Sequence, residues 1–202
     1  MRHRPEDAKK WGGIMCLEGD YEESLEDRSS MLPILDLLER VSRDGITYIH
    51  RDVGTRAELD YYLRKWIERN DYYTLYLSFH GTADGIQMSE HDDGTATLEH
   101  LADILADAIN DCVVHFGSCS VLAAEDQRLQ HFLARTGARA VMGYAKDVDW
   151  LDSAALDMVV LATLGRYKQL GTGLRQLEEA PRYASLRKEL GFRIVQSKAA
   201  RR

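Results

Sequence analysis

Two apolar segments of the sequence each lead into a residue that could act in catalysis. His80 follows an apolar run over residues 73–79, and Cys119 follows another run over residues 112–116. A cysteine thiolate is a strong nucleophile, and an imidazole can give or take the protons that substitution at a carbonyl requires. The residue types therefore predict a thiol nucleophile served by a histidine, provided that the fold brings the two together.

The elements that must position these residues follow from the hydrophobic pattern. Apolar runs alternate with amphipathic segments along nearly the whole chain, which is typical of β-α units over a mainly parallel sheet. Strands are expected at residues 13–17, 46–50, 73–79, 112–116, 138–144 and 192–195. Helices are expected at residues 31–41, 55–67, 98–109, 124–135 and 151–167, with shorter helical pieces at 171–179 and 186–190. We therefore predict an α/β three-layer sandwich, with a mainly parallel sheet of about six strands and helices on both faces.

Local signals support two of these elements. Thr55 and Glu58 form a capping box, and apolar residues recur at helical spacing after it, so two signals predict the second helix. Residues 82–97 are polar and rich in turn formers, which predicts a short hairpin that begins near Gly85. Residues 91–93 are expected at its exposed tip, where they could border a substrate cleft.

The strand ends are where the chemistry is expected. Ligands of open parallel sheets collect beyond the carboxyl ends of the strands. If the third and fourth strands are neighbours, His80 and Cys119 face each other at one edge of the sheet. The amides of Gly81 and Cys119 could then hold the oxyanion, and a side chain at position 81 would crowd the scissile carbonyl. A helix that begins a few residues after Cys119, together with a charged His80, would favour the thiolate.

This order of motifs resembles the caspase-like (clan CD) cysteine peptidases, the group that contains caspases, metacaspases, separases and CHAT domains. The resemblance rests on a strand followed by His80 and Gly81, a strand followed by Gly117–Ser118–Cys119–Ser120, and the segment 137–143. It spans residues 13–164, of which 119–164 look most like a CHAT domain. The resemblance implies a caspase-like sheet, a His80/Cys119 dyad, an oxyanion contact from the Gly81 amide and endopeptidase activity on proteins.

Other positions bear on specificity and control. Many relatives that cut after basic residues have an acidic residue two positions before the nucleophile, where this sequence has Gly117. Arg28 lies roughly where caspases hold an arginine for acidic substrates. Asp147 and Asp149 follow the fifth strand, either as helix-start residues or as part of a specificity pocket. About 20 residues join Cys119 to the next strand, too few for the linker that caspases cut on maturation, so we expect control by a partner protein, a ligand or gating loops.

The composition excludes several function classes. The 202 residues carry 26 basic and 33 acidic side chains, a net charge of −7, which argues against a nucleic-acid-binding domain. The first residues lack the apolar run of a signal peptide, and no segment approaches the roughly 20 apolar residues of a membrane span. Three scattered cysteines predict reduced thiols and a cytoplasmic protein. We expect one domain over residues 1–202, with an extension at 1–12, a basic tail at 197–202 and no organic cofactor.

Other interpretations of the same residues were weighed. Cys16 and Cys112 lie inside strand-like runs and are expected in the core. A zinc site at Cys112, His115 and Cys119 is not expected, because a strand turns the first two to opposite faces. A cysteine amidase with a nucleophile elbow would need a later histidine, and the candidate, His131, lies in mid-helix. A catalytically silent adapter with a caspase-like fold is the remaining alternative, and the oligomeric state is left open.

Overall fold

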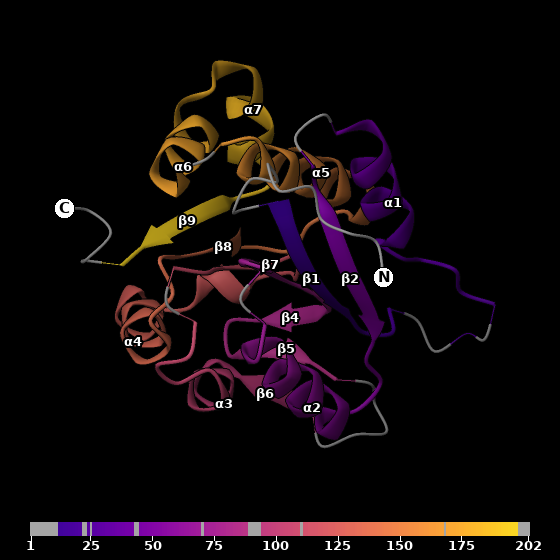
Figure 1. Cartoon of the computed structure of the whole chain (residues 1–202), viewed down its shortest axis with the longest axis vertical. Helices are drawn as coiled ribbons and strands as arrows, with labels where there is room; N and C mark the ends of the chain where they lie inside the picture. Colours follow the sequence, from indigo (N-terminus) through magenta and orange to yellow (C-terminus); the bar gives the residue numbers. More distant parts are fainter. Residues whose placement is uncertain are drawn as a thin grey trace.

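The computed structural model describes residues 12–21, 24, 26–42, 45–69, 71–88, 94–109, 111–167 and 169–197. Over these residues the main sheet has six strands in the order β2-β1-β3-β7-β8-β9 (Figure 1). The strands are β1 (Gly13–Glu18), β2 (Thr47–Asp52), β3 (Thr74–Ser78), β7 (Val113–Phe116), β8 (Ala140–Tyr144) and β9 (Phe192–Gln196). The first five are parallel and β9 is antiparallel to β8, which confirms the predicted mainly parallel sheet.

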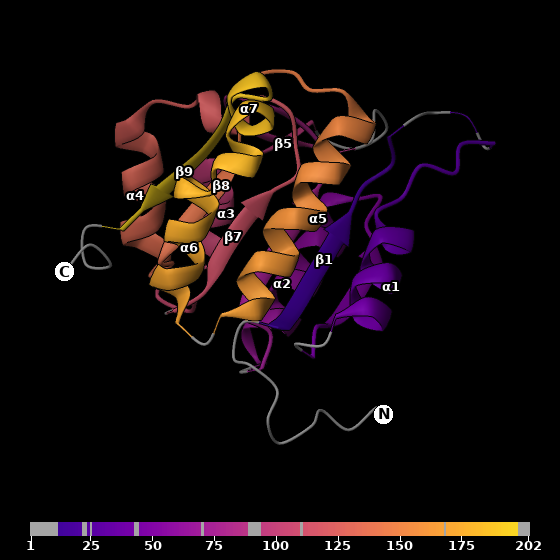
Figure 2. The same ribbon diagram turned by 90° about the horizontal axis from the view of Figure 1, so that it is seen from above.

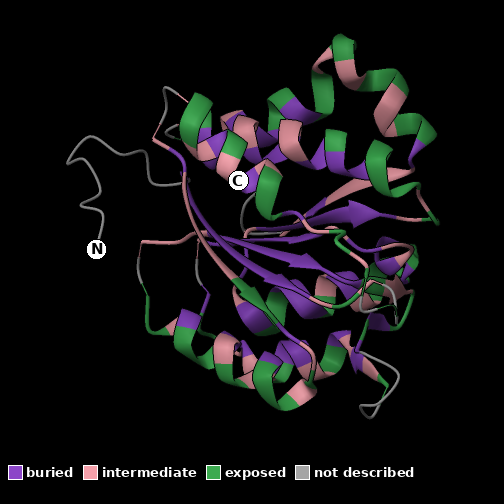
Figure 3. Cartoon of the chain, turned by 90° about the vertical axis from the view of Figure 1, so that its right-hand side faces the viewer, coloured by how far each residue is buried: buried purple, intermediate pink, exposed green. Residues whose placement is uncertain are grey.

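Helices cover both faces of this sheet, so the predicted three-layer α/β sandwich is confirmed (Figures 1 and 2). One face carries α1 (Leu32–Val41), α5 (Trp150–Arg166), α6 (Leu170–Glu179) and α7 (Pro181–Glu189). The other face carries α2 (Arg56–Ile67), α3 (Leu98–Ile104) and α4 (Asp126–Thr136). Figure 3 shows the strands buried between two helical layers whose outer surfaces are exposed.

Both faces of the central strands are buried, which explains why these strands read as continuous apolar runs. In β1, Met15 and Leu17 pack into the core on the α2–α4 side, whereas Ile14 and Cys16 pack beneath α1 and α5. Cys112 is also in the α2–α4 core, while His115 contacts α5. The burial of both cysteines is confirmed, and Cys112 and His115 lie on opposite sides of the sheet as predicted.

The predicted capping box begins α2. The Thr55 hydroxyl accepts a hydrogen bond from the Glu58 amide at 3.3 Å, and the Glu58 carboxylate accepts one from the Thr55 amide at 3.1 Å. Leu59, Leu63 and Trp66 then repeat at helical spacing and are buried against the sheet. The capping box and the buried apolar face of α2 thus both confirm the helix that the sequence predicts.

The hairpin predicted from Gly85 is present as the antiparallel pair of β5 (Gly85–Gln87) and β6 (Thr95–Thr97). The structure adds β4 (His80–Thr82), which pairs with β5 and completes a second, three-stranded antiparallel sheet. A strand of three residues is too short to show an alternating pattern, so β4 could not be recognised in the sequence. The predicted tip at residues 91–93 lies outside the described residues, as do residues 1–11 and 198–202 of the predicted extension and tail.

The strands of the central sheet end at one level. Glu18 of β1 pairs with Ser78 of β3, and Leu77 pairs with Phe116 of β7. Beyond these pairs, the Gly117 amide donates to the Leu77 carbonyl at 2.8 Å. The segments that carry the predicted dyad residues therefore leave the sheet side by side. Within the described part of the chain, no helix is long and apolar enough to cross a membrane.

Candidate active site

The side chain of Ser118, the residue before Cys119, connects the two strand ends by hydrogen bonds. The Ser118 hydroxyl accepts a hydrogen bond from the Phe79 amide at 3.2 Å and donates one to the Leu77 carbonyl at 3.3 Å. Ser118 is fully buried. The residues next to His80 and Cys119 are thus hydrogen-bonded to each other across the β3–β7 boundary, which confirms that these strand ends are neighbours.

Gly81 lies directly against the backbone of Cys119. A Cβ atom at position 81 would come 2.6 Å from the Cys119 carbonyl oxygen, 2.7 Å from a Val121 methyl and 2.9 Å from the Ser118 Cβ. Real Cβ contacts do not reach such distances, so the close approach requires glycine. From the sequence, we predict that a side chain at position 81 would crowd a substrate carbonyl. The structure shows that such a side chain would also collide with the turn that carries Cys119.

A backbone carbonyl orients His80. The exposed imidazole has its Nε2 atom 2.7 Å from the carbonyl oxygen of Tyr21. Since a carbonyl only accepts, Nε2 carries the hydrogen, and Nδ1 of the neutral ring is left as the basic nitrogen. The Tyr21 ring meets the His80 ring edge to face, with centroids 5.9 Å apart, and meets the Trp150 ring in the same way at 6.1 Å. The contact of Tyr21 with His80 could not be predicted from the sequence, because every residue type has a backbone carbonyl.

Cys119 is partly exposed and has an amide directed at its sulfur. The Val148 amide donates to Sγ at 3.5 Å, and the thiol can donate to the Val148 carbonyl at 3.8 Å. The next residue, Ser120, has a φ of 56°, and its amide donates to the Lys146 carbonyl at 3.1 Å. The loop after β8 therefore holds the sharp turn that carries Cys119.

The three predicted pocket residues have different surroundings. Asp147 accepts a hydrogen bond from the Ser120 hydroxyl at 2.8 Å, beside the nucleophile. Asp149 is the N-cap of α5, and its carboxylate accepts from the amides of the first turn at 2.9 and 3.1 Å. Arg28 is exposed. The structure thus brings Asp147 to the turn that carries Cys119 and gives Asp149 the helix-start role, while substrate contact by any of the three stays a prediction.

The position of Gly117 explains one departure from the resembled family. A Cβ atom there would come 2.5 Å from the hydroxyl oxygen and 2.6 Å from Cε2 of Tyr76. An acidic side chain two positions before the nucleophile would therefore overlap the Tyr76 ring. Any selectivity of this chain for basic residues must use other groups.

A small acidic pocket opens beside Tyr21. Its volume is about 130 Å³, and none of the described residues that line it is a lysine or an arginine. The lining residues are Glu18, Gly19, Asp20, Tyr21, Ser24, Asp27, Ser29, Ser30 and Asp52. Arg28 is not among them, although it belongs to the same loop.

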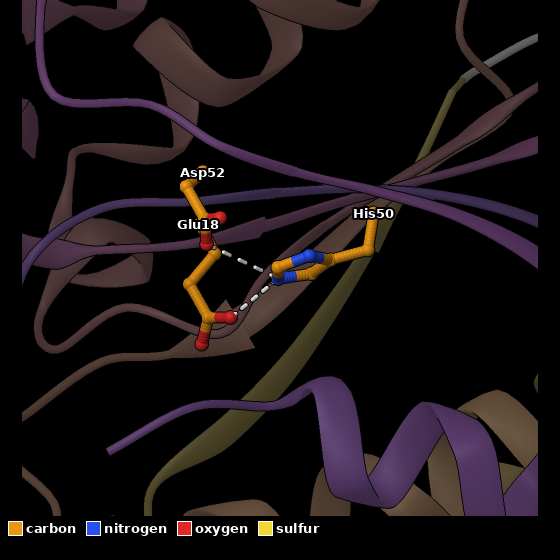
Figure 4. Close-up of side chains that lie close together, drawn as sticks. All are labelled: Glu18, His50 and Asp52. Carbon is orange, nitrogen blue, oxygen red and sulfur yellow. Dashed lines mark hydrogen bonds and ion pairs between the residues drawn. The ribbon is translucent and has the colours of Figure 1, made fainter. Parts of the chain in front are cut away.

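Two of the pocket residues, Glu18 and Asp52, form a cluster with His50 (Figure 4). The Nε2 atom of His50 lies 2.6 Å from a Glu18 carboxylate oxygen and 3.8 Å from one of Asp52. All three groups are of types that ligate metal ions. Glu18, however, also accepts hydrogen bonds from the Ser30 hydroxyl and the Met31 amide, each at 2.7 Å. Its hydrogen bonds thereby join β1, β2 and the start of α1, and this structural role accounts for the cluster.

A protein of known structure has a similar fold. The chain is similar to the solved structure of a secreted C11 cysteine protease from Bacteroides thetaiotaomicron in complex with an irreversible peptide inhibitor. The TM-score is 0.60 and the sequence identity 12%, and the match covers 86% of this chain and 58% of the protease. The chain therefore spans less than two thirds of that protein, and the likeness shows the caspase-like α/β fold.

At the level of sequence, no protein of curated function matches the chain. The model of a family of unknown function, DUF6642, matches residues 12–196. This match includes the sheet, both helical layers and the candidate active site, so the chain belongs to the DUF6642 family.

Proposed function

We propose that this chain is a cysteine endopeptidase in which Cys119 is the nucleophile and His80 transfers the protons. The observation that carries the proposal is the packing of Gly81 on the Cys119 backbone, which holds β4, the strand that begins with His80, against the turn that carries Cys119. The Tyr21 carbonyl supports it, because it leaves Nδ1 of His80 as the proton acceptor. The fold shared with the Bacteroides cysteine protease is consistent with this chemistry.

The reaction follows from these roles. Nδ1 of His80 takes the thiol proton, and the sulfur of Cys119 adds to the scissile carbonyl carbon. The amides of Gly81 and Cys119 are the proposed donors to the oxyanion. Collapse of the adduct breaks the carbon–nitrogen bond, and the imidazolium of His80 gives its proton to the leaving amine. Water, activated by His80, then hydrolyses the thioester and regenerates the thiol.

Substrate and control are further parts of the proposal. The substrate would be a protein or peptide, with Asp147 next to the nucleophile turn as the best placed of the predicted pocket residues, ahead of Asp149 and Arg28. We retain the predictions of one domain, of a CHAT-like relationship and of control by a regulatory partner or ligand. In the described part of the chain no disulfide joins the three cysteines, which suits the predicted cytoplasmic location, although the Bacteroides protease is secreted.

Mapping new protein N-termini tests the proposal directly. The wild type, Cys119→Ala and His80→Ala are incubated with native and denatured cell proteomes, and the cuts are identified by mass spectrometry. We expect cuts with the wild type alone, and their sequences report the residue preferred before the cut. His131→Ala removes another exposed histidine, on α4, and should cut like the wild type.

Each other outcome has a distinct meaning. Cuts that persist with Cys119→Ala would show that the proposed mechanism is wrong. Loss of activity in His131→Ala would favour an amidase-type arrangement with a later histidine. A folded wild type that neither cuts proteins nor is labelled at Cys119 by a peptidyl acyloxymethyl ketone would favour a silent adapter.

A further inference from the structure

A buried carboxylate lies beneath the candidate active site. Asp157 of α5 is 1% exposed, and the Tyr76 hydroxyl of β3 donates to it at 2.7 Å. The Tyr144 hydroxyl of β8 approaches it at 2.5 Å and also lies 2.9 Å from the Ser153 carbonyl. The Asp157 carboxylate thus connects two strands of the sheet to the helix that covers them.

His115 of β7 adds a third strand to this cluster. Its Nε2 lies 2.8 Å from Asp157, and the side chain is fully buried. The ring stacks on Tyr76, with centroids 5.1 Å apart and an angle of 21° between the planes. Among the described residues none hydrogen-bonds Nδ1 of His115. Nε2 of His115 is therefore the ring nitrogen that can donate to the Asp157 carboxylate.

From Tyr76, hydrogen bonds continue to the loop that holds His80. The Ser78 hydroxyl donates to the Tyr76 hydroxyl oxygen at 3.4 Å, and Ser78 also shares a short hydrogen bond with the Tyr21 hydroxyl. Tyr21 in turn accepts from Nε2 of His80 through its carbonyl at 2.7 Å. Asp157 is therefore connected to His80 by hydrogen bonds through Tyr76, Ser78 and Tyr21.

Tyr76 also reaches the other half of the dyad. Its ring packs so closely on Gly117 that a Cβ there would overlap three ring and hydroxyl atoms. Gly117 precedes Ser118 and Cys119, so its contact with the Tyr76 ring restricts where the chain that leads to Cys119 leaves β7. One buried side chain thus contacts the segments of both His80 and Cys119.

We propose that Tyr76, anchored by Asp157, and Tyr21 are positioning residues of the dyad: the hydroxyl chain fixes the Tyr21 carbonyl that orients His80. The inference rests on the proposed peptidase function, because it assigns a role within that same site. Tyr76 is fully buried and contacts the Gly117 segment, and Tyr21 contacts His80, so each is assigned to act through His80 or Cys119. A fixed carbonyl partner keeps the imidazole in one orientation and one tautomer, as an acid–base group requires.

The surroundings keep the chain of donors intact at neutral pH. Burial raises the pKa of Tyr76, and the nearby charge of Asp157 raises it further. Burial likewise raises the pKa of Tyr21, followed by the charge of Glu18 and a smaller effect of Cys16. Both hydroxyls therefore remain protonated. Substitution by phenylalanine removes the donor while keeping the ring, including the part of Tyr76 that packs on Gly117.

The test is the pH dependence of Cys119 alkylation by iodoacetamide, followed at the Cys119 peptide by mass spectrometry. This readout needs no substrate and reports the coupling of the thiol to His80. The wild type gives the pH profile of alkylation expected when the Cys119 thiol is coupled to His80. The variant His80→Ala gives the profile without that coupling. We expect Tyr76→Phe and Tyr21→Phe to lose at least fivefold in rate at pH 6 relative to the wild type, while the rate at pH 9 stays within twofold.

Tyr144→Phe is the matched control, because it also removes a buried hydroxyl from Asp157 but lies outside the chain to Tyr21. It should keep the profile of the wild type. Equal losses in Tyr144→Phe and Tyr76→Phe would overturn the inference, since any lost hydrogen bond to Asp157 would then suffice. Wild-type profiles in both Tyr76→Phe and Tyr21→Phe would overturn it as well.

A different result would count against the proposed function itself. If His80→Ala has the same profile as the wild type, the thiol and the imidazole are not coupled, and the dyad and the positioning role fail together. Circular dichroism and urea midpoints establish that each variant is folded. If Tyr76→Phe does not fold, Tyr21→Phe decides the matter, because Tyr21 is only partly buried and lies in a loop.

Discussion

The α-carbon of Gly81 packs against the carbonyl of Cys119, so closely that an added Cβ would lie 2.6 Å from the carbonyl oxygen. This contact joins β4, which begins with His80, to the turn that presents the thiol. The space is filled on three sides, by the Cys119 carbonyl, Ser118 and Val121. The separation of the two dyad residues is therefore sensitive to the size of residue 81.

Gly81→Ala should abolish most of the peptidase activity while the protein remains folded. The added methyl group must push β4 away from the Cys119 turn, and a displacement on the order of 1 Å can cost about 100-fold in rate. We expect at least that loss in kcat/KM on a peptide chosen from the N-terminal mapping. Gly171→Ala, at an exposed helix position with open space around it, is the control and should match the wild type. Full activity of Gly81→Ala would contradict the assigned geometry.

Gly117→Asp should destabilise the fold and confer no selectivity for basic residues. The carboxylate would meet the Tyr76 ring, and overpacking of this kind costs roughly 1–3 kcal/mol, with a further cost for the buried charge. Urea denaturation should show the lower free energy of unfolding. Gly171→Asp introduces the same charge at a helix start and should cost little. A stable Gly117→Asp variant that cuts after arginine would show that Tyr76 moves aside.

Two substitutions of Asp149 separate its capping role from a role in specificity. Asp149→Ala removes the side chain that accepts the first two amides of α5 and should cost about 1 kcal/mol of stability. Asparagine caps as well as aspartate, so Asp149→Asn should retain the wild-type free energy of unfolding. A changed cleavage profile in the stable Asp149→Asn would establish that its charge selects substrates. An unchanged profile would leave Asp149 as a helix cap alone.

Alkaline pH should unfold the protein through its buried tyrosines. Burial raises the pKa of Tyr76 and of Tyr144 well above about 10, the value for tyrosine in an unfolded chain. Below pH 10 both states hold these protons and stability is at its full value. Above it the unfolded state releases them first, so each tyrosine lowers the free energy of unfolding by about 1.4 kcal/mol per pH unit, up to its folded pKa.

Urea midpoints measured from pH 9 to 11 check this expectation. The free energy of unfolding of Tyr76→Phe should fall less steeply with pH than that of the wild type, by the contribution of one tyrosine. At pH 7 the variant should be less stable than the wild type. Tyr61→Phe removes an exposed hydroxyl and controls for the substitution itself. If the slope is the same in Tyr76→Phe and in the wild type, Tyr76 does not ionise on unfolding in this range, and the prediction is wrong.

Much of the architecture can be predicted from local patterns in the sequence. The buried runs before His80 and Cys119 are strands because both faces of the sheet are covered, and Thr55 with Glu58 begins α2 by a contact three residues apart. The strand positions in turn placed both reactive residues at carboxyl ends. The small sheet of β4, β5 and β6 was only partly recognised, because each strand has three residues and the pairing decides their conformation.

The α/β layering and the two residues that could form a dyad are predictable from the amino-acid sequence, since apolar periodicity and strand-end position are local properties. The groups that surround these two residues depend on how distant elements pack. Tyr21 reaches His80 across 59 residues through a backbone carbonyl, which any residue type has. Asp157 meets Tyr76 across 81 residues, from a helix whose sequence position says nothing about which strand it covers. Packing of distant elements creates such contacts, and their donors and acceptors become specific only once the chain is folded.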